Sequence, residues 1–164
     1  MQLQTLLAPL QTQGLVELDA QENFLVLRLL GHAMFDSGKA EIRADMRPTP
    51  HAIGSIVGET PHEIFVAGHT DNVPTRGGTY KSNLELSAAR AASVVEFFIL
   101  QGLVSADKVA TMGFGEYRPL APNDSPENLQ RNRRVEIILA KPPTPPGQGF
   151  PFSPSTPFLL SPHR

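Results

Sequence analysis

The sequence predicts an α/β domain of the α+β kind, a two-layer sandwich in which helices pack on one face of a mixed four-stranded sheet. Four short runs rich in Val, Ile, Leu and Phe have the length and composition of strands. One long segment between the second and third runs has apolar residues at helical spacing, and a weaker helical pattern lies between the first and second. The elements follow the order β, α, β, α, β, loop, β, and the crossovers should be right-handed.

The first part of the chain contains one strand and two interrupted helical patterns. Residues 1–14 carry leucines at helical spacing, broken by Pro9, so we expect a short amphipathic helix whose leucines dock on the domain or on a second copy of it. Residues 24–30 form an apolar run that ends at Gly31, which is typical of a buried strand. Prolines interrupt the helical spacing of residues 39–57 and predict a broken or kinked helix.

The middle of the chain contains the clearest helix. Residues 64–68 are the second expected strand. Ser82 and Glu85 form a capping box that begins a helix over residues 84–101, and Gly102 ends it. We expect this helix to place near its buried face Leu86, Ala89, Val94, Phe97 and Leu100.

The last strands precede an abrupt change of composition. Strands are expected over residues 109–115 and 135–140, with a proline- and asparagine-rich loop over residues 118–131. Eight of the sixteen prolines fall in the last 23 residues, among isolated phenylalanines that suit a docking segment. The chain therefore divides into an amphipathic linker segment over residues 1–23, a folded domain over residues 24–141, and a Pro-rich tail over residues 142–164 that we expect to be disordered.

Composition excludes several classes of function. The chain has 164 residues, enough for one core, and a net charge of −2, which gives no electrostatic case for binding nucleic acid. It has no cysteine, so disulfides, thiolate nucleophiles and cysteine-based metal sites are excluded. No window approaches the roughly 18 apolar residues of a membrane span, and the N-terminus does not have the pattern of a signal peptide. We expect no cofactor.

An acid and a base occupy positions that favour a binding site. Asp71 follows the strand over residues 64–68, and the carboxyl ends of strands are where α/β folds place ligands. Arg90 lies near the second turn of the next helix. A fixed carboxylate and a fixed guanidinium together suit a zwitterion, with Asp71 accepting an ammonium and Arg90 binding a carboxylate. From the residues alone, Asp71 is equally suited to cap a turn, and Arg90 to form a structural ion pair with it.

Several separated motifs, in this order, resemble one family. They are Phe35-Asp36-Ser37, the run from Gly68 to Pro74, the run from Tyr80 to Ala91, the run from Gly113 to Pro119, and the run from Asn132 to Glu136. The chain resembles the OmpA-like peptidoglycan-binding domain from about residue 25 to residue 141, and within that family the periplasmic domain of MotB-type flagellar stator subunits. The long loop over residues 74–80 favours the stator-like branch.

The resemblance implies non-covalent binding of the diaminopimelate residue in the stem peptide of the cell wall, which would anchor a stator complex. It implies that Asp71 grips the amine, Arg90 the carboxylate, and that Asn83 and Arg133 complete the pocket. Further residues expected at its rim are Thr70, Asn72, Asp36 and Ser37, beside Phe35. The implied protein is a homodimer, partnered by a MotA-like membrane subunit, whose periplasmic domain is joined to an inner-membrane anchor outside this chain.

Other functions remain open on the sequence. The same pocket would serve an OmpA-like outer-membrane tether or a secretion-system anchor, and Gly38, where many family members carry asparagine, suits an interaction module without a wall ligand. An enzyme would need a nucleophile with its base, and Ser87 has no convincing histidine partner. His69 and Asp71 have no obvious third metal ligand, so we expect His69 to hydrogen-bond at the edge of the core.

Overall fold

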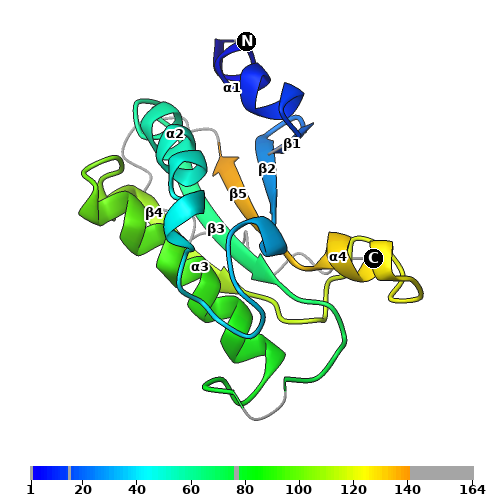
Figure 1. The fold of residues 1–164 in the computed structure, drawn as a ribbon. Helices are drawn as coiled ribbons and strands as arrows, with labels where there is room; N and C mark the ends of the chain where they lie inside the picture. Colours follow the sequence, from blue (N-terminus) through cyan, green and yellow to red (C-terminus); the bar gives the residue numbers. More distant parts are fainter. Residues whose placement is uncertain (1, 15, 76–77, 141–164) are drawn as a thin grey trace, which may run out of the picture.

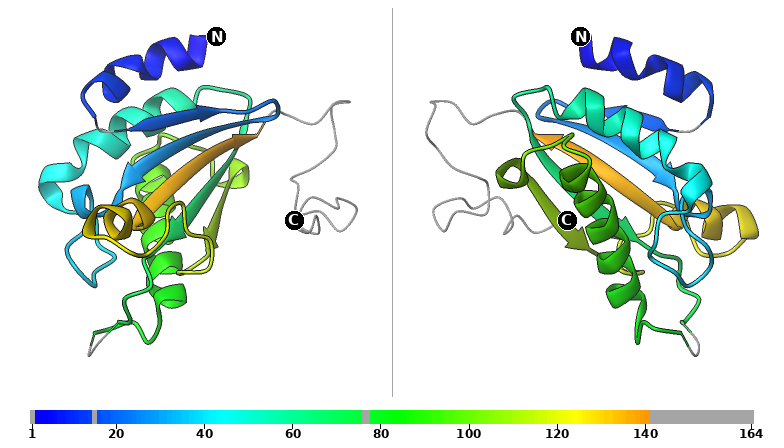
Figure 2. Two further views of the ribbon diagram at one scale, coloured as in Figure 1. Left: turned by 90° about the vertical axis from the view of Figure 1, so that its right-hand side faces the viewer. Right: turned by 60° about the vertical axis from the view of Figure 1, so that its left-hand side comes forward.

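Two helices cover one face of a five-stranded sheet (Figures 1 and 2). The computed structural model describes residues 2–14, 16–75 and 78–140. The sheet order is β1-β2-β5-β3-β4, and only the β3–β4 pair is parallel. The strands are β1 (Glu17–Ala20), β2 (Phe24–Leu30), β3 (Glu63–His69), β4 (Val109–Gly113) and β5 (Arg134–Ala140), and the helices are α1 (Gln2–Thr12), α2 (Pro48–Val57), α3 (Asn83–Leu100) and α4 (Pro126–Asn132).

The mixed sheet is confirmed, but the expected number of four strands is wrong. The fifth strand, β1, lies within the segment we predicted to be a linker and pairs antiparallel with β2. It is only four residues long, and both of its ends are exposed, so it has no apolar run that periodicity would detect. The four predicted strands all form, and the central pair β5 and β3 runs antiparallel from Glu63 opposite Ala140 to His69 opposite Arg134.

The N-terminal helix docks on the domain. Leu7 of α1 is fully buried, and Leu3 and Val16 belong to the same core cluster as the residues between the sheet and its helices. Of the two dockings expected for these leucines, the structure therefore shows the one on the domain itself. No helix in the described part of the chain is long and apolar enough to cross a membrane. The predicted Pro-rich tail, residues 142–164, lies outside the described residues.

The predicted break in the helix of residues 39–57 is confirmed. A short 3-10 helix, Ala44–Met46, comes first, and α2 begins at Pro48. Proline suits the first helical turn because no intrahelical partner exists there for a backbone N–H. Residues 36–43 consequently form a loop, pinned by the bridge between Phe35 and Ile42, and this loop reaches α3.

Helix α3 begins and ends as predicted, and it packs unusually close to the sheet. The Ser82 hydroxyl accepts a hydrogen bond from the Glu85 N–H at 3.1 Å, which confirms the cap. A Cβ added to Gly68 would lie 2.0 Å from the Ser87 carbonyl oxygen, and one added to Gly113 would lie 2.6 Å from the Cβ of Ala88. Because only glycine permits this approach, α3 lies directly against β3 and β4 at the end where the candidate site forms.

Two expectations about helices are wrong. Leu100 is 81% exposed, because the C-terminal end of α3 extends beyond the buried face that Val94 and Phe98 occupy. The region of residues 118–131, expected to be a loop, contains α4 (Pro126–Asn132). Its start carries a signal that was available in the sequence, since Ser125 caps it by accepting a hydrogen bond from the Asn128 N–H, with Pro126 in its first turn.

Candidate functional site

A cavity of about 710 Å³ lies at the carboxyl end of β3 and the start of α3. The loop that follows β2, the loop that follows β3, helix α3 and the residue before β5 all contribute to its walls. The charged or polar residues that line it are His32, Ser37, Lys39, Thr70, Asp71, Thr75, Thr79, Tyr80, Asn83, Arg90 and Arg133.

The carboxylate of Asp71 is buried at the base of the loop after β3. Its Oδ2 accepts a 2.7 Å hydrogen bond from Nη1 of Arg133, and its Oδ1 accepts one from the Val73 N–H at 3.0 Å. The Asp71 side chain is 6% exposed and that of Arg133 is 39% exposed, so the pair has one buried and one accessible member. Asp71 therefore caps its own turn and also presents a negative charge to the cavity.

The guanidinium of Arg90 is held by backbone oxygens rather than by a carboxylate. Nε donates to the Lys39 carbonyl at 2.8 Å, and Nη2 donates to the Asp36 carbonyl at 3.2 Å. The group also lies 5.0 Å from the centre of the Phe35 ring, a cation–π contact. The alternative of an ion pair between Arg90 and Asp71 is wrong, because the partner of Asp71 is Arg133.

Burial leaves Arg90 as a strongly desolvated positive charge. Burial lowers the pKa of Arg90, and so does the charge of Arg133, whereas the charge of Asp71 raises it. Nη1 of Arg90 donates to none of the residues that the structure describes, and Arg90 lines the cavity. A guanidinium in this state favours an anionic ligand, because a carboxylate supplies both the charge and the acceptors that water no longer provides.

Asn83 and Thr70 hold the Asp71 loop in place. The Asn83 amide donates to the Asp71 carbonyl at 3.3 Å and to the Val73 carbonyl at 3.0 Å. The Thr70 hydroxyl donates to the Asp71 carbonyl at 2.8 Å. Both side chains are buried, so the loop conformation that aims Asp71 into the cavity is fixed by the first residue of α3 and by the residue that follows β3.

Six of the eight predicted site residues line the same cavity: Ser37, Thr70, Asp71, Asn83, Arg90 and Arg133. Asn72 and Asp36 are not among its lining residues. Asp36 contributes through its backbone carbonyl, and its side chain is exposed. The sequence patterns did not single out His32 and Lys39, which also line the cavity, because irregular loops bring them there and no periodic pattern marks such loops.

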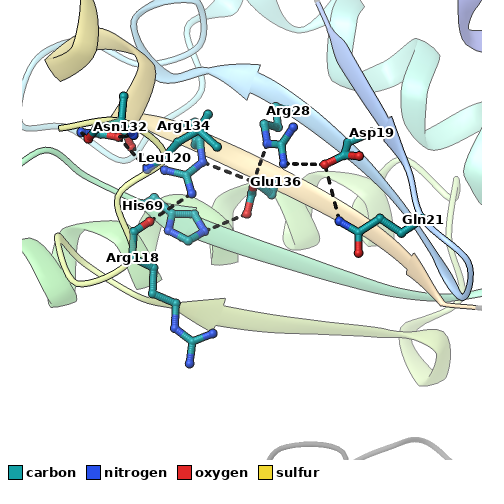
Figure 3. A network of polar contacts seen from close by, with 10 residues as sticks. Asp19, Gln21, Arg28, His69, Arg118, Leu120, Asn132, Arg134 and Glu136 are labelled. Carbon is teal, nitrogen blue, oxygen red and sulfur yellow. Dashed lines mark hydrogen bonds and ion pairs between the residues drawn. The ribbon is translucent and has the colours of Figure 1, made fainter. Parts of the chain in front are cut away.

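A second polar network lies beside the site on the sheet face that carries no helix (Figure 3). The carboxylate of Glu136 accepts a hydrogen bond from Arg28 Nε at 2.8 Å, another from Arg134 Nε at 3.3 Å, and lies 3.0 Å from Nε2 of His69. The hydrogen bond expected for His69 at the edge of the core is not formed with regular geometry, because both ring nitrogens are buried without a hydrogen-bond partner in the described part of the chain and Glu136 is the polar neighbour of Nε2. The His69 ring also stacks on Phe114, with ring centres 5.1 Å apart.

The electrostatics of this network place the negative charge on Glu136. Burial alone would raise the pKa of Glu136, but the neighbouring His69 ring, the charge of Arg134 and the hydrogen bond from Arg28 lower it to about 2. Burial lowers the pKa of His69 below its ordinary value of 6.5, so the ring is neutral at pH 7. The charged Glu136 therefore lies beside a neutral imidazole at the end of β3, two residues before Asp71.

Ser87, the candidate nucleophile, has a structural position. Its hydroxyl donates to the Leu84 carbonyl at 2.9 Å and accepts from the Gly115 N–H at 2.9 Å. These bonds fasten α3 to the turn after β4. The cavity contains opposed fixed charges, an arrangement whose charges are complementary to an ammonium and a carboxylate group.

Comparisons with known proteins agree with this architecture. The model of the OmpA family matches residues 34–133. Motility protein B of Bacillus subtilis is 35% identical over 116 residues, which cover 70% of this chain and 44% of that protein. The chain thus spans less than half the length of this relative.

Two solved structures share the fold. The cell wall anchor of the T6SS from Pseudomonas aeruginosa superposes with a TM-score of 0.79 at 30% identity, covering 85% of this chain and 97% of that chain. The periplasmic domain of Helicobacter pylori MotB superposes with a TM-score of 0.71 at 31% identity, covering 78% of this chain and 83% of that chain. With the family match extending over most of the folded part, this chain belongs to the OmpA family.

Proposed function

We propose that this chain binds peptidoglycan without cleaving it, and that its cavity takes the diaminopimelate residue of the stem peptide. The observation that carries the proposal is the convergence of Asp71, Arg90 and Arg133 on one cavity of about 710 Å³. Diaminopimelate carries an ammonium and a carboxylate on the same terminal carbon of its side chain. The cavity offers one buried carboxylate and two guanidiniums, which match these two charges.

In this proposal, the buried and accessible charges have different roles. Arg90, fixed by two backbone carbonyls, receives the ligand carboxylate without having to reorganise. Asp71 receives the ligand ammonium in place of, or together with, the accessible Arg133 guanidinium that now pairs with it. Asn83 and Thr70 keep the Asp71 loop in this conformation, and Ser37 contributes to the rim.

Wall binding would anchor a flagellar motor stator complex in the periplasm. The similarity to Motility protein B and to the periplasmic domain of MotB supports this assignment. In this stator proposal, the chain forms a homodimer and works with a MotA-like membrane subunit. It is joined to an inner-membrane anchor that lies outside this chain. The domain would hold the complex stationary against torque.

A second candidate is a cell-wall tether in another machine, such as a secretion system or an outer-membrane protein. The similarity to the cell wall anchor of the T6SS, at a TM-score of 0.79, favours it. Both candidates share the wall ligand and differ in the attached membrane part. A chimaera in which this chain replaces the matching region of a Motility protein B separates them, since restored swimming supports the stator and wall binding without swimming supports the tether.

Sedimentation with purified diaminopimelate-type sacculi tests wall binding. The parent chain should pellet with the sacculi, and Asp71→Asn and Arg90→Gln should each weaken binding about tenfold or more, because each removes a charge-assisted contact. Asp107→Asn and Lys108→Gln are matched controls, since both residues are exposed and are not among the residues that line the cavity.

Two further readouts make the result decisive. Circular dichroism melting of every variant shows whether a loss of binding reflects unfolding. The supernatant is analysed for soluble muropeptides, whose release would contradict the non-catalytic role. Failure of the folded parent to pellet at any sacculus concentration would contradict wall binding and would favour an interaction module.

A further inference from the structure

The cavity carries more positive than negative charge. The described residues that line it include three bases, Lys39, Arg90 and Arg133. They include a single acid, Asp71. The terminal group of diaminopimelate has one ammonium and one carboxylate, so it brings no net charge of its own. Binding of that group alone therefore leaves the excess of positive charge in the cavity without a counterpart on the ligand.

The backbone of Lys39 is fixed directly against Arg90. The Lys39 carbonyl accepts the hydrogen bond from Arg90 Nε at 2.8 Å, and the Lys39 N–H donates to the Asp36 carbonyl at 3.0 Å. Gly38 permits this turn, because its φ of 70° lies in the left-handed region. The loop thus lies alongside α3 (Figure 1). The side chain of Lys39 consequently starts from a fixed point beside the guanidinium that we assign to the ligand carboxylate.

The ammonium group of Lys39 is available to a ligand. The residue is exposed and lines the cavity, and it forms no ion pair with any residue in the described ranges. The carboxylate of Asp36, on the same loop, lies 3.8 Å from Nε of Arg43 instead. A lysine ammonium is a compact charge on a flexible stem, so it reaches a nearby acceptor without a fixed geometry.

The cavity is also larger than the terminal group of diaminopimelate requires. Its volume of about 710 Å³ falls within the range of about 300–1,000 Å³ typical of pockets that bury most of a drug-sized molecule. A stem peptide offers further carboxylates close to diaminopimelate. The preceding glutamate is linked through its side chain, which leaves its α-carboxylate free, and the C-terminal end of the peptide carries another.

We propose that Lys39 binds a second carboxylate of the stem peptide, beside the one that Arg90 binds. This inference rests on the proposed function and adds a specificity to it. Amidation converts a carboxylate into a neutral carboxamide, which removes the charge that the lysine would pair with. The site therefore distinguishes a stem peptide whose second carboxylate is free from one in which that group is amidated.

Calorimetric titration of the full chain with three N-acetylated tripeptides of alanine, γ-linked glutamate and diaminopimelate tests this specificity. One peptide is unmodified, one is amidated at the glutamate α-carboxyl, and one at the main-chain carboxyl of diaminopimelate. All three keep the terminal group proposed for Asp71 and Arg90. At least one amidation should weaken binding to the parent about fivefold, and the peptide affected identifies the carboxylate that Lys39 binds.

Variants of Lys39 assign the effect to its ammonium group. Lys39→Gln should bind the unmodified peptide about fivefold more weakly than the parent, and it should no longer respond to that amidation. Lys39→Arg retains the charge and should retain the preference. Lys81→Gln is the matched control, because Lys81 is exposed and near the start of α3 but is not among the residues that line the cavity. Its affinities should equal those of the parent.

The outcomes separate this inference from the proposed function. Equal affinity of the parent for the three peptides would overturn the role of Lys39 while leaving wall binding intact. An amidation effect as large in Lys39→Gln as in the parent would also overturn it. Failure of the folded parent to bind even the unmodified peptide would contradict the proposed function itself, and with it the second carboxylate site.

Discussion

Arg133 donates a 2.7 Å hydrogen bond to Asp71, although 62 residues separate them. The register of the sheet brings them together, because His69 of β3 pairs with Arg134 of β5, and each site residue lies just beyond that pair. The Arg133 side chain is 39% exposed, so the ion pair contributes little to the stability of the domain. The ion pair instead places a positive and a negative charge side by side in the wall of the cavity.

Arg133→Gln should therefore weaken binding to sacculi more than it destabilises the fold. We expect a change of no more than about 1 kcal/mol in the free energy of unfolding, with a loss of about tenfold in affinity. Urea titration and sacculus sedimentation measure the two quantities on one preparation. A large loss of stability with unchanged affinity would show that the residue is structural.

Gly68→Ala should displace α3 from β3. The new Cβ would lie 2.0 Å from the Ser87 carbonyl oxygen, and overpacking of this kind costs about 1–3 kcal/mol or more. Because α3 carries Arg90 and Asn83, we also expect weaker wall binding. Gly78→Ala is the control for stability, since a Cβ there would meet nothing within 4 Å. Thermal melting of the two variants compares them, and equal melting temperatures would contradict the close packing.

Asn132→Ala should destabilise the protein by about 2–4 kcal/mol, since it leaves buried backbone groups unpaired. The fully buried Asn132 side chain accepts from the N–H groups of Leu120 and Ala121 and donates to the Ala121 carbonyl. Asn128→Ala, which loses only an exposed bond to Asp124, should cost much less. Urea denaturation of both variants provides the comparison, and similar midpoints would contradict the structural role of Asn132.

Acid should destabilise the domain through Glu136 and His69. The pKa of Glu136 is about 2 when folded and 4.5 ordinarily, so its contribution is complete above pH 4.5 and is lost as the pH falls toward 2. This contribution amounts to at most about 3 kcal/mol. The pKa of His69 is also lowered, so protonation of the unfolded chain reduces stability below about pH 6.5.

Urea titrations between pH 7 and pH 2 measure this dependence. The parent should lose stability continuously from about pH 6.5 downward, first through His69 and then through Glu136. Glu136→Gln should flatten the lower part of the curve, below pH 4.5. If the stability of Glu136→Gln falls with pH in parallel with that of the parent, titration of Glu136 is not the cause of the acid destabilisation.

The sequence predicted the parts of the site that local chemistry determines. Asp71 follows an apolar run, and Ser82 with Glu85 fixes the start of the helix that carries Asn83 and Arg90. These signals are short in range and do not depend on how the sheet is assembled. Apolar runs and helical spacing are also local signals, and from them four of the five strands and the long helix were predicted.

The rest depended on long-range packing. Strand β1 exists because its backbone pairs with β2, and its alternating apolar signal is too short to detect. The partner of Asp71 follows from the register of β5 on β3, which no local pattern encodes. The backbone carbonyls that hold Arg90 come from the loop around Lys39, whose course is set by contacts with α3. The start of α4 was the exception, since Ser125 marked it.

Calorimetric titration with two stem peptides, identical except for diaminopimelate or lysine at the third position, tests the central claim most directly. Lysine retains the ammonium and lacks the terminal carboxylate that Arg90 is proposed to bind. We predict that the diaminopimelate peptide binds about tenfold or more tightly than the lysine peptide, and that Arg90→Gln abolishes this preference. Equal affinity for the two peptides in the folded parent chain would contradict recognition of a zwitterion by Asp71 and Arg90.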